Sequence, residues 1–457
     1  MKATKRVWNF SVAGVILVLV ASLGVGDLGA QDPDQIPGVR LGLVYSSSYL
    51  PALAVQPFTG RFGGAGLASQ VEAIVGRDMH NSDRFEVMDS LPRGLVGDRV
   101  DYTLWDRLGA VWLVSGQVEG AGEGYVLTLE LHDVVYGEVR ERGRFRIPNP
   151  VDEDFRMAVH RVSDEIVRWA TGDPGMAASR IAFTMTDSEF NKDVWIVDSD
   201  GENLRRVTDF ASLLESPTWS IDGSKLAYTS WKSGYARIYE LDLATGHERM
   251  LPTVRGAGDY VTPAYHPDGR TLAFSVLGSD TRSGIFTYDW ERDCCLSYLS
   301  GGPWYDLGPT YSADGRWMAF NTLRFGDPVP QVMIMPAQGG GAETLSPYEY
   351  GSGGYFTSPD WSPFGDLVAF HGRVERGRYH IIVANLDDGG RVIRRLTREG
   401  NNEDPSWAPD GRHLVFVGER SWGFGLFVVD VSTGRLRAIL GGRRVGLPDW
   451  SPPLIAR

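Results

Sequence analysis

The sequence contains very little cysteine. Among 457 residues there are two cysteines, Cys294 and Cys295, and they are neighbours in the chain. A disulfide between adjacent residues would be strained, so we predict two half-buried thiols on a strand rather than a redox switch. The fold must therefore be stable without disulfide bonds.

Motifs of the common enzyme classes are also missing. The sequence has no G-x-S-x-G nucleophile motif, no H-E-x-x-H motif and no phosphate-binding loop of the G-x-x-x-x-G-K-[ST] type. The eight histidines are scattered without the spacing of metal ligands. We therefore expect a protein that is not an enzyme, with no catalytic residues, no bound metal and no cofactor.

Positive charge is in deficit. Lys and Arg number 45, Asp and Glu number 58, and the formal net charge is −13 at pH 7. An acidic protein repels the phosphates of DNA and RNA, so we expect no nucleic-acid partner.

A single long apolar run, residues 10–25, lies near the start of the chain. It follows Lys2, Lys5 and Arg6 and precedes the small residues Gly29 and Ala30. This pattern predicts a secretory signal peptide over residues 1–30, which would leave an exported protein without stable membrane insertion. A retained membrane anchor is the competing interpretation, because the apolar run is long. No cysteine lies near residue 30, so we expect no lipid attachment there.

One motif recurs through the second part of the chain. It consists of an aromatic residue, then Ser, Ala or His, then a turn of the Pro-Asp-Gly type and an apolar strand, and its first copy is SPTWSIDGSKLAYTS at residues 216–230. The successive copies lie 46, 46, 50, 46 and 43 residues apart, measured between the aromatic residues Trp219, Tyr265, Tyr311, Trp361, Trp407 and Trp450. This period is typical of β-propeller blades, and Asp-Gly favours tight turns because glycine accepts a positive φ.

The first and last copies of the repeat are incomplete. Three strands precede the first full copy, and the last copy, LPDWSP at residues 447–452, contains only the leading strand. The C-terminal strand should therefore complete the first blade, which leaves no open sheet edge. Residues 180–457 are thus predicted to form an all-β, six-bladed β-propeller closed by a C-terminal strand.

Residues 31–171 follow a different pattern, in which strands and helices alternate. We predict helices at residues 67–79, 100–108 and 152–170, the last with Asp152 as N-cap and Gly172 as its stop. The predicted strands are residues 41–45, 52–58, 85–90, 110–118, 125–135 and 138–147. This indicates an α/β N-terminal domain, joined to the propeller by a linker at residues 172–179.

The loops on the two faces of such a propeller differ in character. The Asp-Gly turns are regular, and turn formation explains Asp222, Asp268, Asp314 and Asp410 without a bound ion. The other loops vary in length and are rich in aromatic and charged residues, which favours protein binding, although about half of the aromatic residues would instead pack between blades. The predicted partner-binding residues at the propeller mouth are Trp231, Tyr235, Asp259, Tyr260, Trp304, Tyr305, Tyr350, Tyr355, Asn401, Asn402, Glu403 and Trp422.

The whole chain resembles the TolB family, the periplasmic components of the Tol-Pal system. In the N-terminal domain the resemblance lies in ALAVQPF, SDRFEVMD, VDYTLWDRLGAVWLVSGQVEG and AVHRVSDEIVRWATGDPG, and in the propeller it lies in the repeat PxW/Y-S-PDG-x-LAF and the closing PDWSP. The repeat by itself also occurs in peptidase and lyase propellers. Its coupling to this N-terminal domain makes the resemblance more specific.

The resemblance implies a non-catalytic, monomeric scaffold in the periplasm. Its partners would be a Pal-type outer-membrane lipoprotein at the propeller mouth and TolA through the mature N-terminus. It would support outer-membrane integrity, cell division and protein import. Residues 31–51 are longer and richer in proline than the TolA-binding stretch of the family, so contact between TolA and residues 31–40 stays open.

Two alternatives stay open from the sequence. The propeller could belong to an exported hydrolase or polysaccharide lyase, which turnover of oligosaccharides would reveal. It could also be a TolB-like propeller that binds a different ligand of the cell envelope.

Overall fold

The computed structural model describes ten stretches of the chain. They are residues 40–41, 49–88, 100–186, 191–253, 258–278, 283–325, 329–347, 354–375, 377–386 and 392–454. The predicted signal peptide and most of the predicted strand at residues 41–45 lie outside these residues. None of the helices in the described stretches is long and apolar enough to span a bilayer.

The first domain is a mixed sheet with helices on both faces. Its strand order is β4-β2-β5-β6-β7, and β3 also pairs with β5. Successive residues of β5 separate the two faces: Val114 packs beneath α1 and α3, whereas Leu113 packs with Trp105 of α2. The elements are β2 (Ala52–Val55), β3 (Thr59–Arg61), α1 (Ala65–Asn81), β4 (Glu86–Met88), α2 (Tyr102–Arg107), β5 (Trp112–Ala121), β6 (Gly124–Asp133), β7 (Glu138–Ile147) and α3 (Phe155–Thr171).

Of the two predicted ends of α3, only the C-terminal one is confirmed. Gly172 follows the helix with φ 82°, in the left-handed conformation that glycine adopts without steric cost. The N-cap prediction was wrong, because Asp154 occupies that position. Asp152 instead accepts a hydrogen bond from the Asn149 amide at 3.0 Å and closes the preceding turn.

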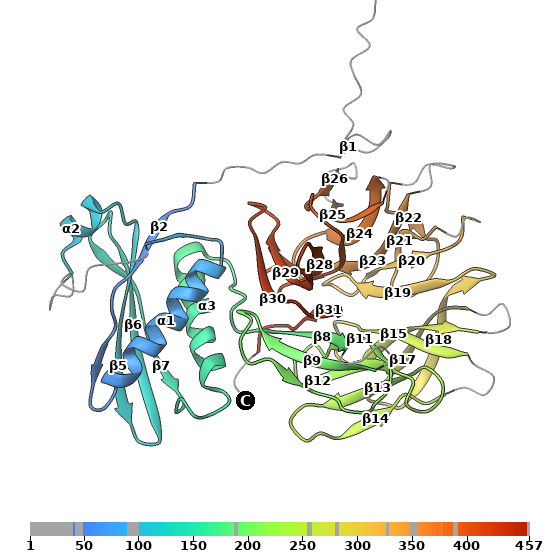
Figure 1. Cartoon of the computed structure of the whole chain (residues 1–457), viewed down its shortest axis with the longest axis horizontal. Coiled ribbons are helices and arrows are strands. Elements are labelled where there is room, and N and C mark those ends of the chain that lie inside the picture. Colours follow the sequence, from blue (N-terminus) through green and yellow to red (C-terminus); the bar gives the residue numbers. More distant parts are fainter. Residues whose placement is uncertain are drawn as a thin grey trace, which may run out of the picture.

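The second domain is a β-propeller of six blades, which confirms the predicted class (Figure 1). Each blade is an antiparallel sheet whose strands lie side by side, from an inner strand that lines the central channel to an outer strand at the rim. The first blade contains β31 (Val445–Trp450), β8 (Arg180–Thr186), β9 (Lys192–Asp198) and β10 (Arg205–Arg206), and the second contains β11 (Leu214–Trp219), β12 (Lys225–Ser230), β13 (Arg237–Asp242) and β14 (Glu248–Met250). The third contains β15 (Asp259–Tyr265), β16 (Thr271–Leu277), β17 (Ser283–Asp289) and β18 (Cys294–Gly302), and the fourth contains β19 (Asp306–Tyr311), β20 (Trp317–Thr322), β21 (Gln331–Pro336) and β22 (Glu343–Thr344). The fifth contains β23 (Tyr355–Trp361), β24 (Leu367–Glu375), β25 (Arg378–Asn385) and β26 (Val392–Arg395), and the sixth contains β27 (Asn402–Trp407), β28 (His413–Arg420), β29 (Gly423–Asp430) and β30 (Leu436–Gly441). A short strand, β1 (Arg40–Leu41), pairs with β26 in parallel.

The chain closes on itself as the repeat count predicts. The C-terminal strand β31 pairs antiparallel with β8, and Trp450 lies opposite Ile181. The Trp450 indole donates a hydrogen bond to Ser179 Oγ at 2.7 Å, and the Ser451 amide donates to the Arg180 carbonyl at 2.8 Å. The inner strand of the first blade therefore comes from the far end of the sequence.

The adjacent cysteines are paired, contrary to the sequence-based expectation of free thiols. Cys294 and Cys295 form a disulfide at the start of β18. Cys295, the second residue of β18, has φ 67°, so the backbone enters the left-handed region where the pairing of β17 and β18 shifts register. The pair links no two elements, and the propeller is still held together by packing and closure.

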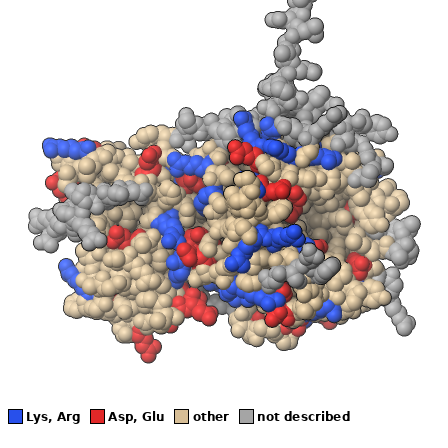
Figure 2. All heavy atoms as spheres, in the orientation of Figure 1, with Lys and Arg blue, Asp and Glu red and all other residues tan. Residues whose placement is uncertain are grey.

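Charged side chains dominate the junction between the two domains. Helices α1 and α3 lie on the propeller side of the N-terminal sheet, and positive and negative groups alternate over the junction (Figures 1 and 2). From α1, Arg77 contacts Glu202 at 2.8 Å, and from α3, Arg156 pairs with Asp200. Such an interface holds the domains in register through specific ion pairs rather than through a continuous apolar core.

Candidate functional site

Each inner strand of the propeller carries the same irregularity. The residue before a proline adopts a positive φ, and the pairing with the second strand shifts register there. Such a bulge turns the strand so that the following residue faces the channel. The six positive-φ residues are Ser216, Thr262, Gly308, Ser358, Asp404 and Leu447.

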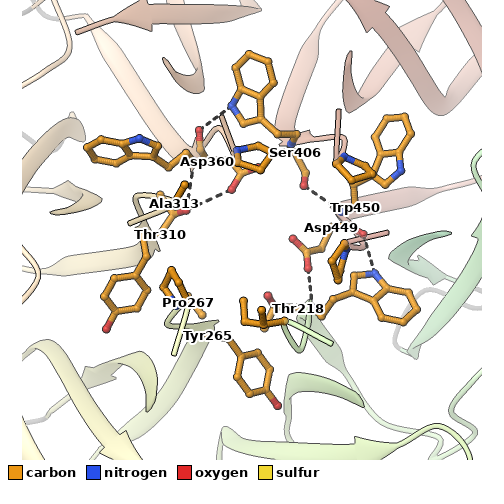
Figure 3. Close-up of a pocket in the computed structure, with 18 of the residues that line it drawn as sticks. Thr218, Tyr265, Pro267, Thr310, Ala313, Asp360, Ser406, Asp449 and Trp450 are labelled. Atoms are coloured by element: carbon orange, nitrogen blue, oxygen red, sulfur yellow. Dashed lines mark hydrogen bonds between the residues drawn. The ribbon is translucent and has the colours of Figure 1, made fainter. Parts of the chain in front are cut away.

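The central channel has two mouths. The cavity on the side of the Asp-Gly turns has a volume of about 330 Å³, and the cavity on the side of the variable loops has about 340 Å³. Figure 3 shows the ring of side chains around the opening. Six residues, one from each blade, line both cavities and form the waist between them: Thr218, Ala264, Thr310, Asp360, Ser406 and Asp449.

The waist residues hold neighbouring blades together. Asp449 accepts the Trp219 amide at 2.7 Å, and Asp360 accepts the Trp407 amide at 2.7 Å. Ser406 Oγ accepts the Trp450 amide at 3.0 Å in the same way. The aromatic residues of the repeat are thus wedges between blades, and they are all buried.

Two waist carboxyl groups have strongly raised pKa values. Burial raises the pKa of Asp449 to about 7, and the charge of Asp360 adds to this effect. Burial also raises the pKa of Asp360 to about 6, against hydrogen bonds from Trp407 and Thr310 that favour its ionised form. Near neutral pH the charge of the channel therefore depends on two coupled titrations.

Replacing Asp449 by Asn should flatten the pH dependence of propeller stability. Because the folded-state pKa is raised above the unfolded value near 3.8, the folded state holds more protons than the unfolded state between about pH 4 and 7, and stability falls as the pH rises. We expect the melting temperature of the parent to decrease across this range and that of Asp449→Asn to decrease less. Parallel curves in calorimetry would contradict this assignment.

The variable loops lie at the predicted face of the propeller. In three blades the end of the second strand, or the turn after it, donates a hydrogen bond to the link that precedes the inner strand. The Trp231 amide donates to the Leu213 carbonyl at 3.1 Å, Leu323 donates to Tyr305 at 3.0 Å, and Glu419 donates to Asn401 at 2.8 Å. These loops surround the mouth that contains the positive-φ residues.

Three of the predicted contact residues are exposed aromatics. Tyr235 is 66% exposed, Trp422 is 50% exposed and Tyr305 is 44% exposed. Tyr235 also lies against the Arg237 guanidinium, with 5.4 Å between the arginine Cζ and the ring centroid. These rings are available to a partner without rearrangement of the loops.

Six further predicted residues are partly buried, and several of them stabilise the loops through packing or hydrogen bonds. These residues are Trp231, Asp259, Trp304, Tyr355, Asn401 and Glu403. Asp259 accepts the Ala236 amide at 3.0 Å, and Tyr355 packs edge-on against Tyr379. The indole N–H of Trp304 has no hydrogen-bond acceptor among the described residues. Burial raises the pKa of Glu403, and the charges of Asp404 and Glu419 raise it further.

Two predicted residues are interior, which corrects their assignment as surface contacts. Tyr260 is 1% exposed because its ring packs on Phe274, with 5.1 Å between centroids. Asn402 is fully buried, where its amide donates to the Glu399 carbonyl at 2.9 Å and accepts from Arg420. Tyr350 lies outside the described residues.

The mouth itself was missed by the sequence-based prediction. None of the predicted residues that the structure describes lines the loop-side cavity, which is formed mainly by the positive-φ residues, the prolines after them and the waist. The available signal was the proline two positions before every repeat aromatic: Pro217, Pro263, Pro309, Pro359, Pro405 and Pro448. These prolines accompany the bulges, and they line the mouth.

Within the described part of the chain, two His-carboxylate groups come close enough to hold a metal, and both lie at the domain junction. They are Asp78, His160 and Asp200, and Asp83, His413 and Asp430. In each group arginines already neutralise the carboxylates: Arg156 pairs with Asp200, and Arg412 approaches Asp430 at 2.6 Å. Since a guanidinium keeps its charge, these groups are better suited to ion-pair networks than to cation binding.

Both parts of the chain match known families. Residues 167–454 match the TolB beta propeller domain, and residues 47–139 match the TolB amino-terminal domain. A Tol-Pal system protein TolB from Albidiferax ferrireducens is 31% identical over 245 residues, covering 53% of this chain and 54% of the relative. One from Methylococcus capsulatus is 33% identical over 214 residues, covering 45% and 49%. The chain thus spans about half the length of the curated relatives it matches.

The fold is shared with a solved structure. The crystal structure of TolB from Acinetobacter baumannii has a TM-score of 0.75 to this chain at 23% sequence identity, covering 89% of this chain and 97% of that one. This likeness extends over both domains.

Proposed function

Because the chain belongs to the TolB family, we propose that it is a non-catalytic scaffold of the Tol-Pal system in the periplasm. Its partner is an outer-membrane lipoprotein of the Pal type, bound at the loop-side mouth of the propeller. Through this contact it supports outer-membrane integrity and constriction of the envelope at cell division. Contact with TolA through the mature N-terminus is a separate part of this proposal.

The observation that carries the proposal is the shape of the loop-side mouth. A preformed cavity of about 340 Å³ is lined by hydroxyls, prolines and Asp404. Exposed Tyr235, Tyr305 and Trp422 lie on loops at the same face. A concave centre with an aromatic rim provides the well-packed pocket and the large side chains that protein interfaces use as hot spots.

Leu447→Asn tests the mouth directly. Leu447 lines the cavity at φ 50°, a conformation that asparagine tolerates better than leucine, so the substitution removes an apolar contact without adding backbone strain. We expect roughly tenfold weaker binding of a purified, lipid-free Pal domain, measured by titration calorimetry. The paired change Trp304→Ala and Tyr305→Ala should weaken binding as well.

Ile221→Asn is the matched control, because Ile221 is an aliphatic residue of similar size that lines the opposite mouth. Unchanged binding in this variant and loss in Leu447→Asn support the proposed face. The reverse pattern would place the partner on the turn side and refute the proposal. If Pal does not bind and the chain instead binds another ligand of the cell envelope, the alternative of a different partner is favoured.

A further inference from the structure

A row of arginines lies along β7, the edge strand of the N-terminal sheet. The strand reads EVRERGRFRI, and Arg140, Arg142, Arg144 and Arg146 are all exposed. No described strand pairs with the outer edge of β7. In a chain with a net charge of −13, this strand is a local concentration of positive charge.

The arginines share one face of the sheet. Phe145 points to the helical side, where its ring lies 6.0 Å from that of Trp169 on α3. Alternation along the strand therefore places Arg142, Arg144 and Arg146 on the opposite face, about 6.8 Å apart. The pairing of β7 with β6 shifts register at Arg140 and forms a bulge there. Arg140 precedes the three other arginines and lengthens the row.

The fold uses only one of these charges. Arg142 contacts Glu130 on β6 at 2.5 Å. Arg140, Arg144 and Arg146 have no ion-pair partner among the described residues. Neighbouring guanidinium groups on one strand repel each other, so the row does not stabilise the domain by itself.

We propose that the open edge of β7 is a docking strand for an acidic, extended segment of a partner protein, whose alternating carboxylates pair with Arg142, Arg144 and Arg146. An added strand bonds to the free backbone groups of β7, and its residues at i and i+2 repeat with the spacing of the arginines. Opposite charges then face each other across the new pair of strands.

The charge distribution favours a linear ligand over a flat anionic surface. Glu130 and Glu119 lie on the adjacent strands of the same face, so the positive charge is confined to the edge. A membrane would meet both signs of charge across the sheet, whereas a peptide laid along residues 142–146 meets three arginines, and the two acidic residues of β7, Glu138 and Glu141, precede that stretch. A second copy of β7 is unsuitable, because arginines would oppose arginines.

Fluorescence anisotropy with the purified chain tests this proposal. The probe is a labelled peptide with alternating acidic residues, Glu-Thr-Glu-Val-Glu-Thr-Glu. We expect saturable binding that weakens with added salt and falls roughly tenfold or more in the double variant Arg144→Glu, Arg146→Glu. The matched control is Arg61→Glu, Arg107→Glu, which reverses two other exposed arginines of the same domain and should leave binding unchanged.

Two further probes separate strand addition from general charge attraction. A peptide of the same composition with its four acidic residues grouped should bind more weakly, and so should an alternating peptide with methylated backbone amides. Equal binding of these peptides, equal loss in both double variants, or no binding at all would overturn the proposal. Arginine-dependent binding to phosphatidylglycerol vesicles without peptide binding would also overturn it, in favour of a membrane ligand.

Discussion

Ending the chain after Arg444, which removes β31, is expected to abolish cooperative folding of the propeller. The loss exposes the inner edge of β8 and removes Trp450, which is 5% exposed and packs in one core cluster with Ile181 and Phe183. Truncating a buried tryptophan alone costs about 3–5 kcal/mol, a large part of the roughly 5–15 kcal/mol that stabilises an ordinary domain. The variant should show a broad thermal transition and bind a hydrophobic dye.

Ending the chain after Leu454 provides the control, because it retains β31 and the hydrogen bonds that Ser451 and Leu454 donate to the carbonyls of Arg180 and Ala178. This variant should melt cooperatively near the temperature of the parent. If the chain ending at Arg444 also melts cooperatively at that temperature, the closing strand does not hold the propeller together.

Asp83→Asn is expected to uncouple the N-terminal domain from the propeller. Asp83 follows α1 and is buried at the junction, where its carboxylate contacts His413 Nε2 at 3.2 Å and Arg437 Nη1 at 3.2 Å. Removing its charge takes away the carboxylate that Arg437 contacts and leaves His413 with Asp410 alone, and breaking a buried ion pair in this way costs about 3 kcal/mol or more. Asparagine tolerates the φ of 50° at this position, so backbone strain is not added.

The geometry around His413 explains why the charge matters. Its other ring nitrogen, Nδ1, lies 2.7 Å from Asp410, so each nitrogen faces a carboxylate and both contacts are hydrogen bonds only in the imidazolium form. Burial alone lowers the pKa of His413, but the charge of Asp410 and hydrogen bonds to Asp410 and Asp83 outweigh it and raise the pKa. His413 therefore bonds to both Asp410 and Asp83 at low pH, and one of these hydrogen bonds is lost as the pH rises through the raised pKa of His413.

Calorimetry and thermolysin cleavage within residues 172–179 would measure the uncoupling. We expect Asp83→Asn to separate the melting transitions of the two domains and to accelerate cleavage of the linker. The matched control is Asp173→Asn, because Asp173 pairs with Arg84 at 2.5 Å but is exposed, and such pairs contribute about 1 kcal/mol or less. Equal effects of the two substitutions would show that the buried cluster does not couple the domains.

Local patterns in the sequence were sufficient for the architecture. The spacing of the repeat predicts six blades, and the Asp-Gly turns predict the positive φ found at Gly223, Gly269, Gly315 and Gly411. The Asp side chains accept amides of their own turns, as in Asp268 with Arg270 at 2.9 Å. These features depend on a few consecutive residues, whose conformational preferences do not require the rest of the fold.

The candidate site was predicted less well. Exposed and buried aromatics look alike in a sequence, so Tyr260 was grouped with Tyr235 although only the latter is exposed. The mouth was missed because the channel combines one residue from each blade, and no short stretch contains that ring.

The repeat period, the turn chemistry and the split copy at the two ends are enough to predict a six-bladed propeller that follows an α/β domain. Contacts between side chains that are distant in the sequence could not be predicted in this way. Asp410 is a turn residue by its sequence, yet through His413 it contacts Asp83, a residue more than 300 positions away. The physical reason is that backbone turns are local, whereas burial and charge pairing depend on elements brought together by packing.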